Sequence, residues 1–500
     1  MEDEHEPLLN RESRGNRSGF IEFEGGIESI KSLGEFNREF VVESKKLWYL
    51  AGPAIFTSTC LYSLGAITQA FAGHVGTLEL AAVSVENSVI AGFSYGLLLG
   101  MGSALETLCG QAYGAGQLDM LGIYMQRSWV ILITTALILS IFYVFATPFL
   151  ILIGQDHRIA DAAGLFSLYM IPQLLAYAVY FSIQKFLQAQ SRMMSMAVIA
   201  STALLLHTFF SWLVMIKLNW GMVGAAVVLN GSWWFIVVAQ LVYIFSGSCG
   251  RAWSGFSWKA FQNLWAFVRL SLASAVMLCL EVWYFMVLII FAGYLKNPEV
   301  SIDGLSMCMN ILAWAVMVAI GSNVATRIVK HVRVSNELGA GHARTAKFSV
   351  VVVVTTSFML GFAISMILLA TKNEWPKAFT NSEAVKKLVS ELTPLLCICI
   401  VVSNVQPVLS GAAIGVGWQT LVAYVNIGCY YFFGIPLGLL LGYKLDFGVT
   451  GIWSGMLAGT GVQILILIWM TYRTNWNKEA SIAGDRIKHW GGEVAKASDA

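Results

Sequence analysis

One carboxyl group stands where a carboxyl group is costly to place. Glu281 lies in an otherwise apolar run, Leu278-Cys279-Leu280-Glu281-Val282-Trp283-Tyr284. The nearest basic residues, Arg269 and Lys296, are 12 and 15 residues away, which is about 18 and 22 Å along a helix. In a membrane-spanning helix Glu281 would therefore lie near the midplane, where an ionisable side chain marks a functional site. Such a group could load and unload a proton between two compartments.

The helical face that carries Glu281 is otherwise apolar and aromatic. One acid within such a surface suits an amphipathic organic ligand. Polar residues of a later apolar run could contribute to the same cavity, although most polar residues in such runs hydrogen-bond between helices. The residues expected to line the substrate cavity are Ser274, Met277, Tyr284, Phe285, Ser403, Asn404 and Gln406.

Two further acids and two prolines need separate interpretations. Glu86 lies inside an apolar run close to its outer end, where it could snorkel to the interface or serve a function. Glu106 ends the same run, where an interfacial pairing role is expected. Pro53 and Pro407 interrupt apolar runs and are candidate hinges, because proline removes a helical hydrogen bond, although kinked helices also occur in static bundles.

The sequence lacks the residue patterns of ATP binding and of the common catalytic and metal sites. The chain contains no phosphate-binding GxxxxGK[ST] loop and no GxSxG, HExxH or kinase motif. A membrane enzyme such as an acyltransferase would need a histidine or paired acids at the midplane, and His207 stands alone in its run. Cys397 and Cys399 have no His, Asp or Glu beside them, so we expect neither a metal nor a cofactor. The net charge of +2 does not favour nucleic-acid binding.

Long apolar runs would hold these residues in position. Hydrophobic residues are 57% of the chain and charged residues 12%, about half the usual share of ~25%. Each run is long enough to cross a ~30 Å hydrocarbon core as a helix. We therefore expect an all-α integral membrane protein with twelve transmembrane helices. The runs cover approximately residues 48–71, 79–105, 122–146, 162–182, 194–216, 222–246, 266–292, 303–325, 348–371, 389–412, 418–441 and 449–471.

The basic residues predict the orientation. With twelve spans both tails lie on one side, and the tail-side segments hold 23 of the 31 Lys and Arg residues. Basic residues concentrate on the cytosolic side, so both tails are expected there. The expected parts are a disordered tail at 1–46, a first lobe at 47–246, a linker at 247–265, a second lobe at 266–471 and a second tail at 472–500.

The first tail carries a possible sorting signal. Glu4-His5-Glu6-Pro7-Leu8-Leu9 is an acidic-dileucine pattern of the kind that adaptor proteins bind, with Glu4, Leu8 and Leu9 as its defining residues. Short patterns of this kind also arise by chance. If the signal is used, it directs the protein to an internal membrane.

Three short sequence motifs of the first half of the chain recur in the second half. Phe71-Ala72-Gly73-His74 returns as Phe291-Ala292-Gly293-Tyr294 after 220 residues. Gly114-Ala115-Gly116 returns as Gly339-Ala340-Gly341 after 225, and Gly221-Met222-Val223-Gly224 as Gly448-Val449-Thr450-Gly451 after 227. An offset of six helices predicts two parallel six-helix lobes around a central cavity, an arrangement typical of secondary transporters.

Three motifs resemble signatures of the plant multidrug and toxic compound extrusion (MATE) transporters. The resemblance covers about residues 45 to 490. Within the family, the sequence resembles the branch that includes vacuolar flavonoid carriers. The motifs are Leu105-Glu106-Thr107-Leu108-Cys109-Gly110-Gln111-Ala112-Tyr113-Gly114-Ala115-Gly116, Val332-Arg333-Val334-Ser335-Asn336-Glu337-Leu338-Gly339 and Gln406-Pro407-Val408-Leu409-Ser410-Gly411.

The resemblance implies proton- or sodium-driven antiport of an organic solute across two six-helix lobes. It identifies Glu281 with the family's acid on the seventh helix and Ser403 with a second acid that many plant members carry, so a relay of two carboxylates is in doubt. Glu86 and the segment Arg327-Ile328-Val329-Lys330-His331 depart from the family pattern. The expected protein is a monomeric carrier, not an enzyme, in the vacuolar or alternatively the plasma membrane. Passive halide transport on the same fold is the alternative function.

Overall fold

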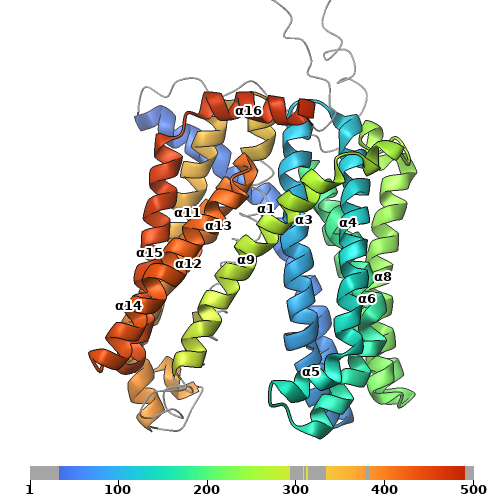
Figure 1. Cartoon of the computed structure of the whole chain (residues 1–500), viewed down its shortest axis with the longest axis vertical. Coiled ribbons are helices and arrows are strands. Elements are labelled where there is room, and N and C mark those ends of the chain that lie inside the picture. The colour runs from blue at the N-terminus through green and yellow to red at the C-terminus, as the bar shows by residue number, and fades with distance from the viewer. Residues whose placement is uncertain (1–32, 293–307, 309–310, 313–333, 379–382, 490–500) are drawn as a thin grey trace, which may run out of the picture.

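The chain folds into helices arranged in two bundles. A computed structural model describes residues 33–292, 308, 311–312, 334–378 and 383–489, and that part contains no strand. Figure 1 shows that the two bundles lie close together at the end where α16 lies and further apart at the opposite end. We call the bundle of α1 to α8 the first lobe and the bundle of α9 to α15 the second lobe.

The first lobe contains eight α-helices and three π-helical segments within the described residues. The α-helices are α1 (Leu33–Val75), α2 (Thr77–Val85), α3 (Gly92–Gly114), α4 (Leu118–Val144), α5 (Ala146–Leu152), α6 (His157–Ala189), α7 (Met193–Ser211) and α8 (Gly221–Tyr243). The π-helical segments are η2 (Glu86–Ala91), η3 (Trp212–Lys217) and η4 (Ile244–Ser248). Short 3-10 turns, η5 (Gly250–Ala252) and η6 (Trp258–Phe261), lead to the second lobe.

The second lobe also consists of α-helices with π-helical segments and a 3-10 turn between them. Its described helices are α9 (Leu264–Ala292), α11 (Ala343–Ala370), α12 (Glu383–Val416), α13 (Gln419–Asn426), α14 (Ile435–Leu439) and α15 (Gly448–Arg473). Its other segments are the 3-10 turn η7 (Trp375–Ala378) and the π-helical η8 (Ile427–Gly434) and η9 (Leu440–Lys444). A final amphipathic helix, α16 (Trp476–His489), lies across the end of the bundle (Figure 1).

Ten helices of the described residues are long and apolar enough to cross a membrane, and they coincide with ten of the twelve expected spans. The expected span at 48–71 lies inside α1, which is not among these ten helices of the described residues. Most of the expected span at 303–325 lies outside the described residues. Helix α1 begins at Leu33, so residues 33–46 of the expected disordered tail are helical. The acidic-dileucine pattern lies outside the described residues.

The backbone supports the internal repeat. Gly116 and Gly341 both adopt a left-handed conformation, with φ of 72° and 80°. Asn219 and Gly221, which precede and begin α8, have φ of 51° and 55°, and their counterparts Asp446 and Gly448 at α15 have 58° and 56°. Left-handed φ is uncommon away from glycine, so matched pairs at the repeat offsets indicate the same local fold in both halves.

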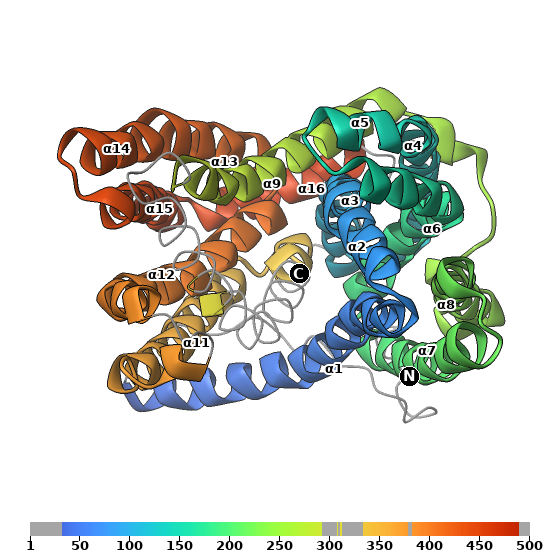
Figure 2. The same ribbon diagram turned by 90° about the horizontal axis from the view of Figure 1, so that it is seen from below.

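Two helices run between the lobes. Figure 2 shows α1 extending from α2 and α7 to α11, and α9 extending from α3 to α13. Gly100 of α3 allows α9 to approach closely, because a Cβ there would lie 2.8 Å from the Cα of Ala275. The linker is fixed to α4: the Gln126 side chain donates to the Gly255 carbonyl at 2.8 Å, and Arg127 donates to the Lys259 carbonyl at 3.0 Å.

Candidate functional site

Glu281 lies half-buried in the middle of α9, and α12 and α13 bring hydrogen-bond donors to it. Its Oε1 atom accepts from Gln406 Nε2 at 3.0 Å and from Ser410 Oγ at 3.3 Å. Asn426 Nδ2 donates to the same oxygen at 3.5 Å. Gln406 and Ser410 are one helical turn apart on α12, so one face of that helix supplies both. Amide and hydroxyl donors stabilise a carboxylate without adding a charge.

The contacts of Glu281 continue into a larger polar group, which we call the Glu281 network. Gln463 Nε2 of α15 donates to Asn426 Oδ1 at 2.6 Å, and the Tyr430 hydroxyl donates to Gln463 Oε1 at 2.6 Å. Gln406 Nε2 also reaches the Tyr430 hydroxyl at 3.4 Å. A buried network of this kind stabilises one arrangement of its helices when its members are satisfied. The network consists of Glu281, Gln406, Ser410, Asn426, Tyr430 and Gln463.

The α9 face that carries Glu281 packs into the second lobe. The Tyr284 hydroxyl donates to the Met456 carbonyl at 2.7 Å, and its ring stacks on Tyr430 with centroids 4.1 Å apart. Ser274 Oγ donates to the Leu270 carbonyl of its own helix, and Met277 is fully buried among residues of α12 and α13. These side chains lie on the same helical face of α9 as Glu281. The Phe285 side chain lies outside the described part of the structure.

The expected cavity residues on α12 face different neighbours. Gln406 belongs to the Glu281 network. Asn404 is buried against Gly361 of α11 and donates to the Ile400 carbonyl at 2.8 Å. Ser403 lines a void of about 10 Å³ between α12 and α15. A void of this size holds about one water molecule, so the structure brings Gln406 to Glu281 and turns Ser403 and Asn404 towards helix seams.

Both candidate hinges lie inside helices, Pro53 in α1 and Pro407 in α12. Proline has no backbone N–H, so Pro407 leaves the Ser403 carbonyl without its usual helical donor. Pro407 directly follows Gln406, which places a weak point of α12 beside the Glu281 network. The carbonyl of Pro53 accepts a hydrogen bond from Thr57 Oγ1 at 2.8 Å.

Glycines bring the two lobes into direct contact at the α16 end. A Cβ on Gly114 would overlap the Asn336 carbonyl, and a Cβ on Gly339 would overlap the Gln111 carbonyl. Gly339 is the counterpart of Gly114, and Asn336 that of Gln111, at the repeat offset of 225. The contact is therefore reciprocal, with a local two-fold relation between the lobes. We call these four residues the reciprocal glycine contact.

Hydrogen bonds reinforce this end of the molecule. Thr107 Oγ1 donates to the Ile414 carbonyl at 2.7 Å, and Gln419 Nε2 donates to Thr107 Oγ1 at 2.9 Å. From α16, Arg486 Nη1 donates to Gln111 Oε1 at 2.9 Å and to the Val416 carbonyl at 3.0 Å. Burial lowers the pKa of the Arg486 guanidinium, and the Glu479 carboxylate opposes that shift. Helix α16 thus joins α3 of the first lobe to α12 of the second.

The first lobe buries different polar groups. Glu106 forms an ion pair with Lys185 at 2.9 Å, which confirms the expected pairing role. His207 lies between hydroxyl groups, with Nδ1 2.8 Å from Ser232 Oγ and Nε2 3.1 Å from Thr68 Oγ1. Within the described residues no three His, Cys, Asp or Glu side chains gather as metal ligands would.

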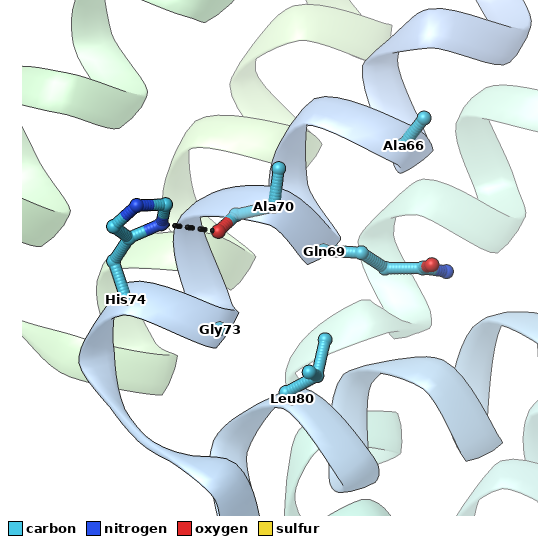
Figure 3. Close-up of a pocket in the computed structure, with 6 residues that line it drawn as sticks. All are labelled: Ala66, Gln69, Ala70, Gly73, His74 and Leu80. Carbon is cyan, nitrogen blue, oxygen red and sulfur yellow. Dashed lines mark hydrogen bonds between the residues drawn. The ribbon is translucent and has the colours of Figure 1, made fainter.

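Figure 3 shows a surface hollow of about 480 Å³ between the end of α1 and the start of α2. Three of its six lining residues are Ala or Gly, and Gln69 and His74 are its polar members. His74 Nδ1 hydrogen-bonds to the Ala70 carbonyl at 2.8 Å, as the dashed line in Figure 3 marks. No residue of the Glu281 network lines this hollow, so we treat it as separate from the candidate site.

Repeated all-helical lobes that cross a membrane, with an ionisable group buried among polar side chains in one lobe, define a secondary transporter. The comparisons with known proteins specify its family. The MatE family model matches residues 53–213 and 273–440. The chain therefore belongs to the MATE family, and it is a multi-pass membrane transporter of organic compounds rather than an enzyme.

Similar proteins and solved structures support the same family. The chain is 66% identical over 470 residues to Protein DETOXIFICATION 29 of Arabidopsis thaliana, covering 94% of this chain and 93% of that protein. It is 57% identical over 455 residues to Protein DETOXIFICATION 33 of the same plant, covering 91% and 93%. The eukaryotic MATE transporter AtDTX14 superposes with a TM-score of 0.81 at 32% identity, covering 90% of this chain and 99% of that one. The Vibrio cholerae MATE transporter VcmN, in its bent form, shares the fold at a TM-score of 0.76 and 16% identity, covering 89% and 99%.

Sequence reasoning missed part of the Glu281 network. Ser410, Tyr430 and Gln463 were not expected to act with Glu281, although Ser410 lies in a quoted motif. A signal was present, because Gln406 and Ser410 are four residues apart in an apolar run and so share a helix face. Gln463 likewise interrupts an apolar run. Nothing in the spacing indicates that these residues from distant helices meet at one carboxyl group.

Proposed function

We propose that the protein exports an organic solute from the cytosol by proton antiport, and that Glu281 binds the coupling proton. The observation that carries the proposal is the set of neutral donors on Glu281 Oε1, namely Gln406, Ser410 and Asn426. These amide and hydroxyl donors stabilise the carboxylate, and a proton that binds to it changes the charge and the hydrogen bonds of the site. A site of that kind can respond to a proton gradient.

The proposed coupling uses the hydrogen bonds of the network. In the ionised state Glu281 accepts from α12 and α13 and holds these helices to α9. A bound proton weakens the acceptor and turns one carboxyl oxygen into a donor, which changes the preferred partners. Pro407 lies beside Gln406, where α12 lacks a backbone hydrogen bond and can bend. Solute and proton would then favour different arrangements of the second lobe, as antiport requires.

The test is uptake into vesicles that contain the purified protein. A gradient of about 2 pH units supplies about 2.7 kcal/mol per proton, enough for about a hundredfold accumulation of a neutral solute exchanged one for one. Glu281→Gln keeps the shape and removes the titratable group, so we expect gradient-driven uptake to fall to the level of empty vesicles. Glu391→Gln, an exposed acid on α12, is the control. Wild-type pH dependence in Glu281→Gln would contradict the proposal.

The solute is proposed to be amphipathic and aromatic, such as a flavonoid glycoside. Support comes from the aromatic side chains beside the network and from the relatives named DETOXIFICATION. A panel of a flavonoid glycoside, an organic acid and chloride distinguishes the candidates. Anion currents that reverse at the chloride equilibrium potential would instead favour passive halide transport, the alternative that a site with one acid leaves open.

We also propose that both tails face the cytosol and that the protein resides in the vacuolar membrane. The orientation is supported by the 23 basic residues of the tail-side segments. Leu8→Ala combined with Leu9→Ala should move a tagged protein to another membrane, such as the plasma membrane, while transport in vesicles is unchanged. A double variant that still reaches the vacuole would show that the dileucine pattern is not used.

A further inference from the structure

The first lobe contains a second buried acid that the proposed mechanism does not use. Glu86 begins the π-helical segment η2, and its residue is 1% exposed. Its Oε1 atom is fully buried and has no hydrogen-bond partner in the described part of the chain. This burial excludes the snorkelling that the sequence allowed, because the carboxyl group does not reach the surface.

Glu106 provides an internal comparison. It lies 20 residues further along the same continuous helical stretch, Thr77–Gly114. Its Oε2 atom pairs with Lys185 Nζ at 2.9 Å, whereas no described side chain donates to Glu86. An ionised carboxylate without a partner is very costly in an apolar interior, so a group in this position becomes neutral.

No cation of the described residues pairs with Glu86. Helices α1, α3 and α8 contain no Asp, Glu, Lys or Arg within residues 53–75, 92–105 and 221–243. On α6, Lys185 is engaged by Glu106, and Arg158 and Asp161 are exposed. Two phenols, Tyr143 on α4 and Tyr177 on α6, interact electrostatically with Glu86, and a phenol is uncharged at neutral pH. The Tyr177 ring packs on Tyr95 of α3.

The backbone at Glu86 is also unusual. Residues 86–91 form a π-helical turn, which holds one more residue than an α-helical turn and occurs often at functional sites. A buried acid without a counter-charge at such a turn satisfies neither packing nor hydrogen bonding in its ionised form. It does satisfy the requirements of a group that holds a proton.

We propose that Glu86 is a second proton-binding site of this transporter, in the first lobe, and that it carries its proton in the conformation described here. The proton forms an O–H bond on the carboxyl group and is released when the lobes rearrange and water or a donor reaches it. Proton binding by Glu86 is independent of the proposed role of Glu281. The contribution of Glu86 to coupling rests on the proposed antiport.

The proton on Glu86 can be observed without transport. A protonated carboxyl group gives an infrared carbonyl stretch that is absent from a carboxylate. In purified full-length protein at neutral pH we expect this band to lose one carboxyl contribution in Glu86→Gln and to be unchanged in Glu106→Gln. Glu86→Asp, which retains an acid, should keep a protonated band at a shifted position. A wild-type band that is unaltered in folded Glu86→Gln would overturn the proposal.

Transport then measures the role in coupling. With two protons per solute, a gradient of one pH unit supports about a hundredfold accumulation of a neutral solute, and with one proton about tenfold. We expect Glu86→Gln to reduce the steady-state ratio from the first value to the second, while Glu281→Gln abolishes it. An unchanged ratio in Glu86→Gln would overturn a coupling role. If wild-type vesicles show no response to pH, the proposed antiport fails, whereas the infrared result on Glu86 stands.

Discussion

The two lobes share a backbone and differ in what they bury. In the second lobe Glu281 is surrounded by amides and hydroxyls from α12 and α13. At the repeat offset of 220 the first lobe has Leu61, which packs in an apolar core. The first lobe places its acids elsewhere, with Glu106 in an ion pair and Glu86 without a partner in the described residues. A repeated fold therefore does not imply repeated chemistry.

The difference has a physical basis. An apolar residue such as Leu61 packs without hydrogen bonds, so its surroundings can be apolar too. An ionised carboxyl group at the equivalent place is stabilised by hydrogen-bond donors, which Gln406, Ser410 and Asn426 supply together. The second lobe thus carries a set of polar residues that has no equivalent around Leu61.

The strongest challenge to this comparison is to move the acid. We expect Glu281→Leu combined with Leu61→Glu to show no gradient-driven uptake, because the donors remain in the second lobe while the carboxyl group is in the first. The measurement is vesicle uptake at several imposed pH differences, with folding checked by size-exclusion chromatography. Each single variant serves as a control. Coupling restored in the double variant would mean that the lobes are chemically interchangeable.

A smaller effect is expected at the reciprocal glycine contact, where the two lobes are alike. Gly114→Ala and Gly339→Ala each place a methyl group against a carbonyl of the opposite lobe, and overpacking of this kind costs about 1–3 kcal/mol. Because the contact is reciprocal, we expect similar decreases in thermal stability and transport for both variants. Gly461→Ala, where a Cβ has no neighbour within 4 Å, is the control. Clearly unequal losses would show that the two-fold relation does not extend to energetics.

The smallest expected effect concerns the bridge that Arg486 of α16 makes between the lobes. Arg486→Ala removes hydrogen bonds to Gln111 and Val416 without placing any group against the other lobe. We expect a lower melting temperature and a few-fold change in transport rate, since the lobes separate more easily at this end. Arg251→Ala breaks an exposed pair with Asp119 and should change little. Equal effects of the two substitutions would count against a bridging role for α16.

The sequence predicted ten of the spans that the structure describes and placed Glu281 in the middle of a helix, but it did not predict which neighbour each side of a helix faces. Glu281 could be placed at the midplane because flanking basic residues measure depth along a helix. Ser403 was expected to line the substrate cavity, yet it faces a seam with α15, because residue spacing gives the depth of a side chain along a helix but not the neighbour that it faces. Glu86 was expected near an interface, and only the packing of neighbouring helices revealed its burial.

The equivalence of the two halves could be predicted from the sequence, whereas the burial of Glu86 could not. Glycines at turns and close contacts leave a readable pattern, because no other residue fits there. Gly114 and Gly339 appeared as a repeated tripeptide and proved to meet each other's lobes. Burial of a single side chain depends on several distant helices at once, and one chain segment does not encode it.

The π-helical turn at η2 contains one residue more than a regular α-helical turn. It lies between the start of the stretch Thr77–Gly114 and the glycines near its other end. Conversion of that turn to a regular α-helix would rotate everything beyond it by about 100° and shift it by about 1.5 Å. Gly110 and Gly114 would then turn away from Ser335 and Asn336. The winding of the π-helical turn beside Glu86 therefore sets the direction in which Gly110 and Gly114 face the second lobe.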